Sequence, residues 1–579
     1  MSSLREIIQR ITLFSMIVGI CCTPGTQQVK EPLPRPDLLK EQCERIGSPR
    51  VEPISEHVWA AIGYDLANEI LINTPEGNVI VDPLMSPKRG EPAKRDLLAS
   101  IPGGPIKAVI YTHSHIDHIG GASLWTEASI PIWATDAFMQ NFFKQYQVFL
   151  PIETIRGRRQ FGDHASVEDL PCNGIGRRTD IRASQEGAGI RLPTKSFSGS
   201  KTLVFGGISI EMIEAHGETQ DQLILWVPED RTLIAADNFY WTFPNLYTIR
   251  GTSPRPVDQW IKSIDTMRRL KPEHLVPCHT VPIHGEQEIE TALTNYRDAI
   301  QWVRDEVIRK ANKGQDLDTI AADIQLPPHL AALHYTTEFY GQVDWSARAV
   351  YTNNLGWFDG RPDRLYPMKV REAAGREIAL MGGSDKVMDL AGEALKAGDY
   401  RWAIHLLTKV RDSGGAGKEL DDALVASYEG LASTLYNLNG RGYLLESAYE
   451  IRHGIEKPAP VKLDENIVAN IPLDGIFTTM ATRLDPEKAM DVHEAVRYVF
   501  PDENKRFVVT VRRGIAEVVE GDPLPGTPEP VATLTVDALT YRKMAAKVTT
   551  PLAALAAGKL KVEGSWLGFL AFSRRFELD

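Results

Sequence analysis

The chain has 579 residues, of which 43% are hydrophobic and 24% are charged, and its formal net charge is −12. These values are ordinary for soluble globular protein, and the length suits about three domains. The acidic balance argues against a nucleic-acid partner, because phosphate backbones favour basic surfaces.

The N-terminus has the layout of a secretory signal. Two arginines precede an apolar run over residues 11–20, and small and turn-forming residues follow it. This order is typical of a signal peptide, and the run is shorter than the roughly 20 residues of a membrane span. We therefore expect residues 1–24 to be a signal peptide that directs the protein to the periplasm or out of the cell. Lipidation at Cys21 or Cys22 and a cytosolic amphipathic start are the alternatives.

The chain has five cysteines, and three of them lie beyond the predicted signal, at Cys43, Cys172 and Cys278. Three cysteines do not make a disulfide framework, and no Cys-x-x-Cys pair is present. We expect neither a disulfide-stabilised fold nor a cysteine-rich structural zinc site.

Beyond the predicted signal, composition and hydrophobic periodicity change along the chain and divide it into segments. Residues 25–55 are rich in Pro, Glu and Lys, which predicts an extended leader. Strand-like runs alternate with helical spacing up to about residue 300, which predicts a layered α/β domain. Clear cases are two strands around a turn at 68–83, a buried strand at 106–112 and a helix at 256–270. The polar, glycine-containing stretch 160–200 predicts a long surface loop or insertion near the site.

The rest of the chain is first helical and then mixed. Residues 290–455 are nearly all helical in pattern and contain helix pairs that resemble a short tetratricopeptide-like bundle. The composition of 457–462 indicates a linker. The final stretch predicts a small α+β domain, with a hairpin at 505–521, strands at 531–536 and 558–565, and helices around 482–499 and 537–557.

The residues with the clearest chemistry follow the strand at 106–112, where 112–121 reads THSHIDHIGG. Four ligand-type side chains converge there: His113, His115, Asp117 and His118. Zinc takes imidazole nitrogen and carboxylate oxygen, and the two glycines permit close backbone approach. The stretch predicts a metal site rather than a surface histidine run.

This pattern after an apolar strand resembles the metallo-β-lactamase superfamily, which implies an αββα sandwich and two zinc ions per chain. By that resemblance His113 and His115 belong to the first metal, and Asp117 and His118 to the second. Upstream, the stretch VIVDP resembles the family's strand-plus-aspartate element. Asp82 there is expected to orient the histidine loop, with a simple turn aspartate as the alternative.

Downstream the resemblance narrows to the zinc-dependent alkylsulfatases. Most superfamily members have a ligand histidine where AHGETQDQ has Glu218, and the alkylsulfatases have glutamate. His216 is the competing candidate. Asp237 in LIAADN lies at the place of the bridging carboxylate, where the better-known alkylsulfatases have glutamate, so this departure puts the substrate in question. The resemblance makes His279 the last ligand of the second metal and leaves His284 as a pocket-edge or structural histidine.

The segment NLYTIRG, residues 245–251, closely resembles the alkylsulfatase stretch that holds the sulfate group. By that resemblance Asn245 and Arg250 bind sulfate oxygens, and a guanidinium offers a planar fork of donors that suits such an anion. Arg255 is a further candidate for the anion, with a solvent-exposed or structural role as the alternative.

The resemblance covers nearly the whole chain. GWFDG (356–360) resembles the alkylsulfatase dimerisation domain and implies a homodimer, and the last part resembles a sterol-carrier-like domain. There Trp566, Phe569 and Phe572 suggest an apolar pocket for alkyl chains. The expected divisions are the signal 1–24, a catalytic domain 25–310, a helical dimerisation domain 311–456 and the sterol-carrier-like domain 457–579.

The resemblance therefore implies a binuclear zinc hydrolase. Its substrate is expected to be an alkyl or aryl sulfate ester with an apolar tail, attacked by a metal-bound hydroxide, with Asp117, Asp237 and Arg250 acting in catalysis. Manganese or iron also suits His and carboxylate ligands. The alternatives are another hydrolase of the same fold, acting on a β-lactam, lactone, thioester or phosphodiester, and a non-catalytic lipid-binding protein. The segment 245–251 favours the sulfatase.

Overall fold

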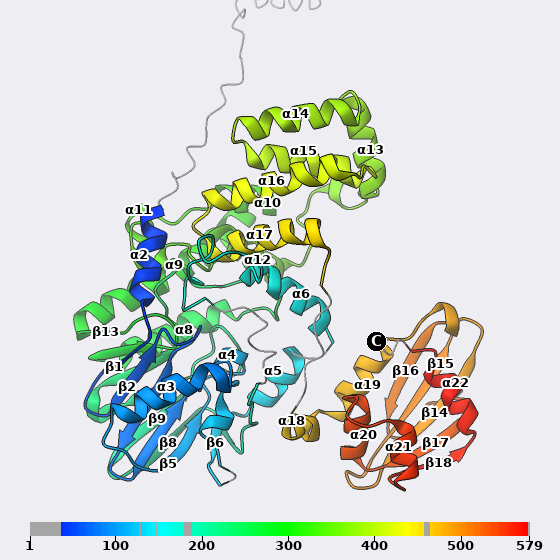
Figure 1. Cartoon of the computed structure of the whole chain (residues 1–579), viewed down its shortest axis with the longest axis horizontal. Helices are drawn as coiled ribbons and strands as arrows, with labels where there is room; N and C mark the ends of the chain where they lie inside the picture. Colours follow the sequence, from blue (N-terminus) through cyan, green and yellow to red (C-terminus); the bar gives the residue numbers. More distant parts are fainter. Residues whose placement is uncertain (1–35, 128, 146–147, 179–187, 457–463, 577–579) are drawn as a thin grey trace, which may run out of the picture.

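The computed structural model describes residues 36–576 except 128, 146–147, 179–187 and 457–463. Within these residues a two-sheet sandwich is followed by a helical region and a small α+β domain (Figure 1). The predicted signal peptide and the predicted linker lie outside the described residues. In the described part, no helix combines the length and the apolar character that crossing a membrane requires.

The first sheet of the sandwich has seven strands that lie side by side in chain order. They are β1 (Arg50–Pro53), β2 (Val58–Ile62), β3 (Glu69–Thr74), β4 (Gly77–Val81), β5 (Ile106–Ile110), β6 (Ile132–Thr135) and β7 (Lys195–Phe197). The strands up to β4 pair antiparallel, whereas β4 to β7 pair in parallel. The parallel strands therefore deliver the residues that follow them to the same edge of the sheet.

The second sheet has six strands in the order β13-β12-β11-β10-β9-β8. They are β8 (Ser200–Phe205), β9 (Ile208–Glu214), β10 (Leu223–Val227), β11 (Thr232–Ala236), β12 (His274–Pro277) and β13 (Ile283–His284). β11 and β12 are parallel, and the other neighbours are antiparallel. Here too the parallel pair brings two loops to one edge.

Alternating side chains of each strand serve two different layers, as the period of two requires. Ile70 and Ile72 of β3 pack between the sheets, while Leu71 faces the helical layer outside. In β11, Ile234 lies between the sheets and Leu233 packs outward. The outer layers are α3 (Pro87–Ala99) on the first sheet and α8 (Val257–Arg269) with α9 (Glu286–Ala311) on the second. The predicted αββα sandwich is confirmed.

Short helices cover the edge of the sandwich at which the parallel strands end. They are α4 (Ile116–Ile119), α5 (Phe138–Gln145) and α6 (Leu150–Phe161). The stretch 160–200 thus begins in a helix, and its described remainder is irregular up to β7, as the sequence predicts.

The helical region follows α9. It contains α10 (Leu317–Asp323), α11 (Pro328–Ala331), α12 (Val343–Leu355), α13 (Val370–Leu380), α14 (Ser384–Lys396), α15 (Tyr400–Asp412), α16 (Lys418–Thr434) and α17 (Leu438–His453). The helices from α14 to α17 pack on their chain neighbours, which confirms the predicted paired helices. Figure 1 shows α17 lying next to α6 of the sandwich.

The C-terminal part is an α+β domain around a five-stranded sheet in the order β16-β15-β14-β17-β18. Its elements are α18 (Glu465–Asn470), α19 (Leu473–Ala481), β14 (His493–Phe500), β15 (Lys505–Arg512), β16 (Ile515–Glu520), β17 (Pro530–Val536), α20 (Ala538–Ala545), α21 (Pro551–Ala556), β18 (Leu560–Gly564) and α22 (Trp566–Ser573). The helix predicted around 482–499 is wrong at 493–499. That stretch is strand β14, because Val496, Tyr498 and Phe500 alternate toward the core.

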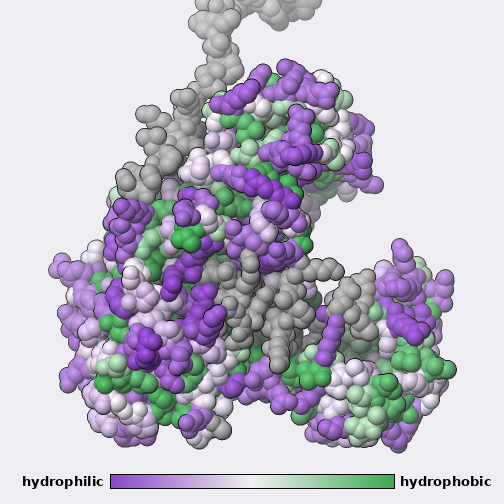
Figure 2. Space-filling view, viewed as in Figure 1, coloured by the Kyte–Doolittle hydropathy of each residue, from purple (hydrophilic) through white to green (hydrophobic). Residues whose placement is uncertain are grey.

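The aromatic side chains that suggested an alkyl-chain pocket belong mainly to the core of this domain. Phe569 and Phe572 are buried in it, and Trp566 packs against it. Hydrophobic side chains also gather on the face of this domain that Figure 2 shows. Leu552 and Leu567 of the domain are exposed. Because both phenylalanines lie in the core, their role is explained by packing within the domain.

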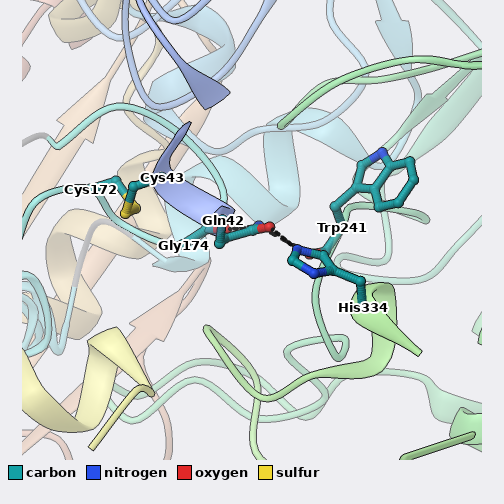
Figure 3. The surroundings of a disulfide bond; sticks show 6 residues. All are labelled: Gln42, Cys43, Cys172, Gly174, Trp241 and His334. Carbon is teal, nitrogen blue, oxygen red and sulfur yellow. Dashed lines mark hydrogen bonds between the residues drawn. A yellow bond between two sulfur atoms is a disulfide. The ribbon is translucent and has the colours of Figure 1, made fainter. Parts of the chain in front are cut away.

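The predictions of an extended leader over residues 25–55 and of a fold without a disulfide are both wrong. Residues 36–46 form helix α2 (Pro36–Ile46), not an extended leader, because Leu39, Gln42 and Ile46 recur at helical spacing and are buried. Cys43 of this helix forms a disulfide with Cys172, 129 residues later in the sequence (Figure 3). Cys278 is free and buried.

Beside the disulfide, the amide of Gln42 joins separate parts of the chain (Figure 3). Its nitrogen donates to the carbonyl oxygens of Gly174, at 2.6 Å, and Trp241, at 3.0 Å. Its oxygen lies 2.7 Å from Nε2 of His334. Helix α2 therefore ties the loop after α6, the loop after β11 and the start of the helical region together.

Candidate metal centre and anion site

The predicted metal ligands all come from loops at one edge of the sandwich. Residues 113–118 follow β5, Glu218 follows β9, Asp237 follows β11 and His279 follows β12. All are buried apart from the half-exposed Ile116 between them. Asp82, which follows β4, lies at the same edge, since β4 and β5 are parallel. The sequence-distant candidates are therefore brought together by the strand order.

The glycines after the histidines permit the close packing that the sequence predicted. A Cβ on Gly120 would lie 1.7 Å from the carbonyl oxygen of Met85, and one on Gly121 would lie 2.0 Å from that of Pro83. Any larger residue would push the loop away from the stretch after β4. The short helix α4, which ends directly before these glycines, carries Asp117 and His118.

The first group of donors contains both histidines of the His-x-His pair. Nε2 of His113 lies 2.8 Å from Nδ1 of His115 and 3.8 Å from a carboxylate oxygen of Asp237. Oε1 of Glu218 lies 3.8 Å from Nδ1 of His115. The structure thus places Glu218 beside the first predicted metal position.

The second group contains Asp117, His118 and His279, whose donor atoms lie within 4.8 Å of one another. Oδ2 of Asp117 is 3.5 Å from Nε2 of each histidine. Asp237 faces this group as well, with its oxygens 3.6 Å from Nε2 of His118 and 3.2 Å from Nε2 of His279. Its carboxylate therefore stands between the two groups.

The imidazoles of His118 and His279 are oriented by contacts to their Nδ1 atoms. Oδ2 of Asp82 lies 2.8 Å from Nδ1 of His118 and accepts a 2.6 Å bond from the hydroxyl of Thr112. The backbone N–H of Thr112 donates to the other oxygen of Asp82 at 2.8 Å. Nδ1 of His279 lies 2.9 Å from the carbonyl oxygen of Leu66. These contacts leave the Nε2 atoms of both histidines facing the centre, and Asp82 holds the loop as the resemblance implies.

Backbone strain marks the same edge. Asp82 has φ of 54° and Ala236, just before Asp237, has φ of 51°, which are left-handed values for residues other than glycine. The pairing of β11 with β12 shifts register between Ile234 and Ala236. A bulge and a strained residue redirect the chain and so aim the carboxylate of Asp237 across the site.

The residues predicted to bind sulfate lie beside the first group. Nη2 of the half-buried Arg250 lies 3.5 Å from Nε2 of His115. Asn245 is buried, and neither atom of its side-chain amide has a hydrogen-bond partner among the described residues. Its free donor and acceptor therefore suit a ligand in the site.

Arg255 is buried, so the solvent-exposed alternative is wrong. Its guanidinium lies 2.8 Å from Oε1 of Glu218 and donates at 2.6 Å to the carbonyl oxygen of Asn245. It fixes both a predicted metal ligand and a predicted sulfate ligand, which is a positioning contact inside the site.

His216, the competing candidate, and His284, the expected pocket-edge or structural histidine, make other contacts. Nδ1 of His216 lies 3.0 Å from the side-chain oxygen of Gln259 on α8. His284 is exposed and contacts His274, with 2.8 Å between their Nδ1 atoms. Because His274 begins β12 and His279 follows the end of that strand, this pair lies at the end of β12 that faces away from the centre.

The donors fit divalent metal ions. Burial lowers the pKa of His113 to about 4, so its imidazole is neutral and has a lone pair to offer at neutral pH. Nε2 of His118, Nε2 of His279 and Oδ1 of Asp237 are buried without a hydrogen-bond partner among the described residues. Unpartnered buried imidazole and carboxylate donors in this number are costly unless a cation joins them.

Leu66 and Gln160 are parts of this site that no sequence pattern indicates. Leu66 acts through its backbone carbonyl, and Gln160 accepts a hydrogen bond from the backbone N–H of Arg250 at 2.9 Å. Neither role leaves a local pattern, because both contacts join residues far apart in the chain.

Family comparisons cover most of the chain. The metallo-beta-lactamase superfamily matches residues 63–279, the alkyl sulfatase dimerisation family 316–454 and the alkyl sulfatase C-terminal family 462–576.

The individual proteins that this chain resembles are alkylsulfatases. A linear primary-alkylsulfatase from Pseudomonas sp. is 32% identical over 535 residues, which cover 88% of this chain and 98% of the relative. An alkyl/aryl-sulfatase of Saccharomyces cerevisiae is 25% identical to this chain. The match covers 89% of this chain and 80% of that relative. The solved structure of a stereoselective inverting sec-alkylsulfatase from Pseudomonas sp. superposes with a TM-score of 0.84 at 25% identity, over 94% of this chain and 87% of that one.

Proposed function

Because the chain belongs to the alkylsulfatase family within the metallo-beta-lactamase superfamily, we propose that it hydrolyses an alkyl sulfate ester to an alcohol and inorganic sulfate. The observation that carries the proposal is the position of Arg250, whose guanidinium lies 3.5 Å from His115 among the predicted metal ligands. An anion-binding fork beside a cluster of metal donors suits a substrate whose charged group must meet both.

We further propose two zinc ions per chain. His113, His115 and Glu218 would hold one, Asp117, His118 and His279 the other, and Asp237 would serve both. Bound zinc supplies a water of lowered pKa and positive charge that offsets the charge of the ester. The mixed imidazole and carboxylate donor set supports this assignment.

The chain's own residues have distinct tasks in this proposal. Asp82 and the carbonyl of Leu66 set the direction of the imidazoles. Arg250 and Asn245 bind the sulfate oxygens. The positive guanidinium of Arg250 stabilises the negative charge that develops as the ester bond breaks. Arg255 keeps Glu218 and the backbone of Asn245 in place from a buried position.

The helical region supports a homodimer. Trp357, Tyr366 and Leu380 are exposed by 72%, 90% and 89% in the single chain. Large exposed hydrophobic side chains in one region are typical of protein interfaces. We propose that a second copy of the chain covers them.

The disulfide supports export. A bond between Cys43 and Cys172 forms and persists in oxidising compartments, such as the bacterial periplasm or the extracellular space. Together with the signal-like residues 1–24, this favours a periplasmic or secreted enzyme.

A substrate panel tests the proposed function. The zinc-loaded protein is incubated with a medium-chain alkyl sulfate, an aryl sulfate, a β-lactam, a lactone, a thioester and a phosphodiester. We expect release of sulfate from the alkyl sulfate to be the fastest reaction. Faster turnover of one of the other substrates by protein that holds its metals would refute the sulfatase assignment while keeping the metal centre.

A further inference from the structure

Helix α6 contacts the chain segment that carries Arg250. Gln160, near the end of this helix, is buried to 1% exposure. Its side-chain oxygen accepts two hydrogen bonds from that segment, at 2.8 Å from the hydroxyl of Thr248 and at 2.9 Å from the backbone N–H of Arg250. One amide oxygen therefore fixes the backbone directly at Arg250.

A second residue of α6 strengthens the same contact. Arg156 lies one turn before Gln160, so both side chains project from one face of the helix. Its guanidinium donates to the carbonyl oxygen of Ile249 at 2.7 Å and 3.2 Å. Consecutive positions of the segment 248–250 are thus held by α6, although this segment has no helix or strand of its own.

Helix α6 is itself anchored to α17. Arg159 pairs with Glu450 at 2.8 Å. At the end of α6 the two backbones touch, since a Cβ on Gly442 would lie 2.6 Å from the carbonyl oxygen of Gln160. The support under Gln160 therefore comes from the helical region through α17.

The chemistry of the amide is informative. The side-chain nitrogen of Gln160 is buried and has no hydrogen-bond partner among the described residues, so the contact uses the oxygen alone. A carboxylate would accept the same two hydrogen bonds, but its charge would lie next to the arginine that must attract an anion. A neutral acceptor holds Arg250 without competing for its charge.

We propose that Gln160 is a positioning residue for sulfate ester hydrolysis, which acts by holding the backbone of Arg250 so that its guanidinium meets the sulfate group beside His115. This inference rests on the proposed function, in which Arg250 binds the sulfate. Misplacement of a substrate-holding group by about 1 Å costs roughly 100-fold in rate, so loss of both hydrogen bonds has a large effect.

The test compares Q160M, Q160E and the exposed matched control Q287M in the zinc-loaded protein. Q160M removes the acceptor at similar volume, and we expect kcat/KM for a medium-chain alkyl sulfate to fall about 100-fold with unchanged zinc content. Q160E keeps the acceptor, and we expect mainly a raised KM, because its charge weakens the attraction of Arg250 for the anion. Q287M should match the wild type.

A double-mutant cycle separates positioning from general stability. If Gln160 acts through Arg250, Q160M in an R250A background should lower kcat/KM by less than twofold further. A full additional 100-fold loss in that background, or unchanged kinetics of Q160M in the wild type, would overturn the proposal. Failure of the wild type itself to release sulfate would instead refute the proposed function, so the two failures are distinguishable.

Discussion

The disulfide between Cys43 and Cys172 is predicted to stabilise the sandwich by tying α2 to it. Replacing both cysteines by alanine removes a cross-link that closes a loop with a sequence separation of 129. The loop-closure entropy of such a chain sets an upper value of about 5 kcal/mol, and measured losses for native disulfides are typically about 2–5 kcal/mol. The buried hydrogen bonds of Gln42 remain in the variant and favour the lower part of that range.

The assay is urea unfolding of the zinc-loaded protein, followed at the first cooperative transition because a chain of several domains need not unfold in one step. We expect the variant C43A/C172A to lose about 2–4 kcal/mol of unfolding free energy at that transition. A reductant should lower the midpoint of the wild type to the same extent and leave the variant unchanged. Equal midpoints for wild type, reduced wild type and variant would refute the reasoning.

Three further predictions concern charge, pH and assembly. R250A removes up to two charge-assisted hydrogen bonds of roughly 1.5–3 kcal/mol each, so kcat/KM should fall about 10²- to 10⁴-fold while the zinc content stays constant; an equal loss of zinc would make Arg250 structural. Burial raises the pKa of Glu69 from 4.5 to about 8, so the folded protein keeps a proton that the unfolded chain releases. Its stability should therefore fall by about 1.4 kcal/mol per pH unit as the pH rises between these values, and E69Q should remove that slope in urea titrations at pH 5 to 8. Replacing Trp357 and Tyr366 by serine should convert a dimer into monomers in sedimentation analysis, and an unchanged dimer would place the interface elsewhere.

The histidine loop was predictable because its donors lie within a few residues and follow a strand. The remaining candidates, such as Glu218 and His279, required the resemblance to a family, since their proximity depends on the order of strands in two sheets. The same dependence explains why Glu218 could not be separated from His216 by the residues alone. The structure separates them, because one faces His115 and the other faces Gln259.

The predictions that failed depend on contacts between distant segments. A cysteine pair 129 residues apart has no sequence signal that identifies it among three candidates. Prolines before helix α2 favour an extended chain in the sequence. The buried face of the helix includes the polar residue Gln42, whose partners lie in distant loops. The helix expected at 493–499 is strand β14 instead, whose buried side chains are interleaved with both polar and apolar residues and so give no clear period in the sequence.

The most direct test of the account is sulfate release from a medium-chain alkyl sulfate before and after removal of the metals. The account predicts that a chelator abolishes release, that zinc restores it, and that the restored protein holds two zinc ions per chain. Sulfate release that persists in protein shown to be free of metal would contradict it.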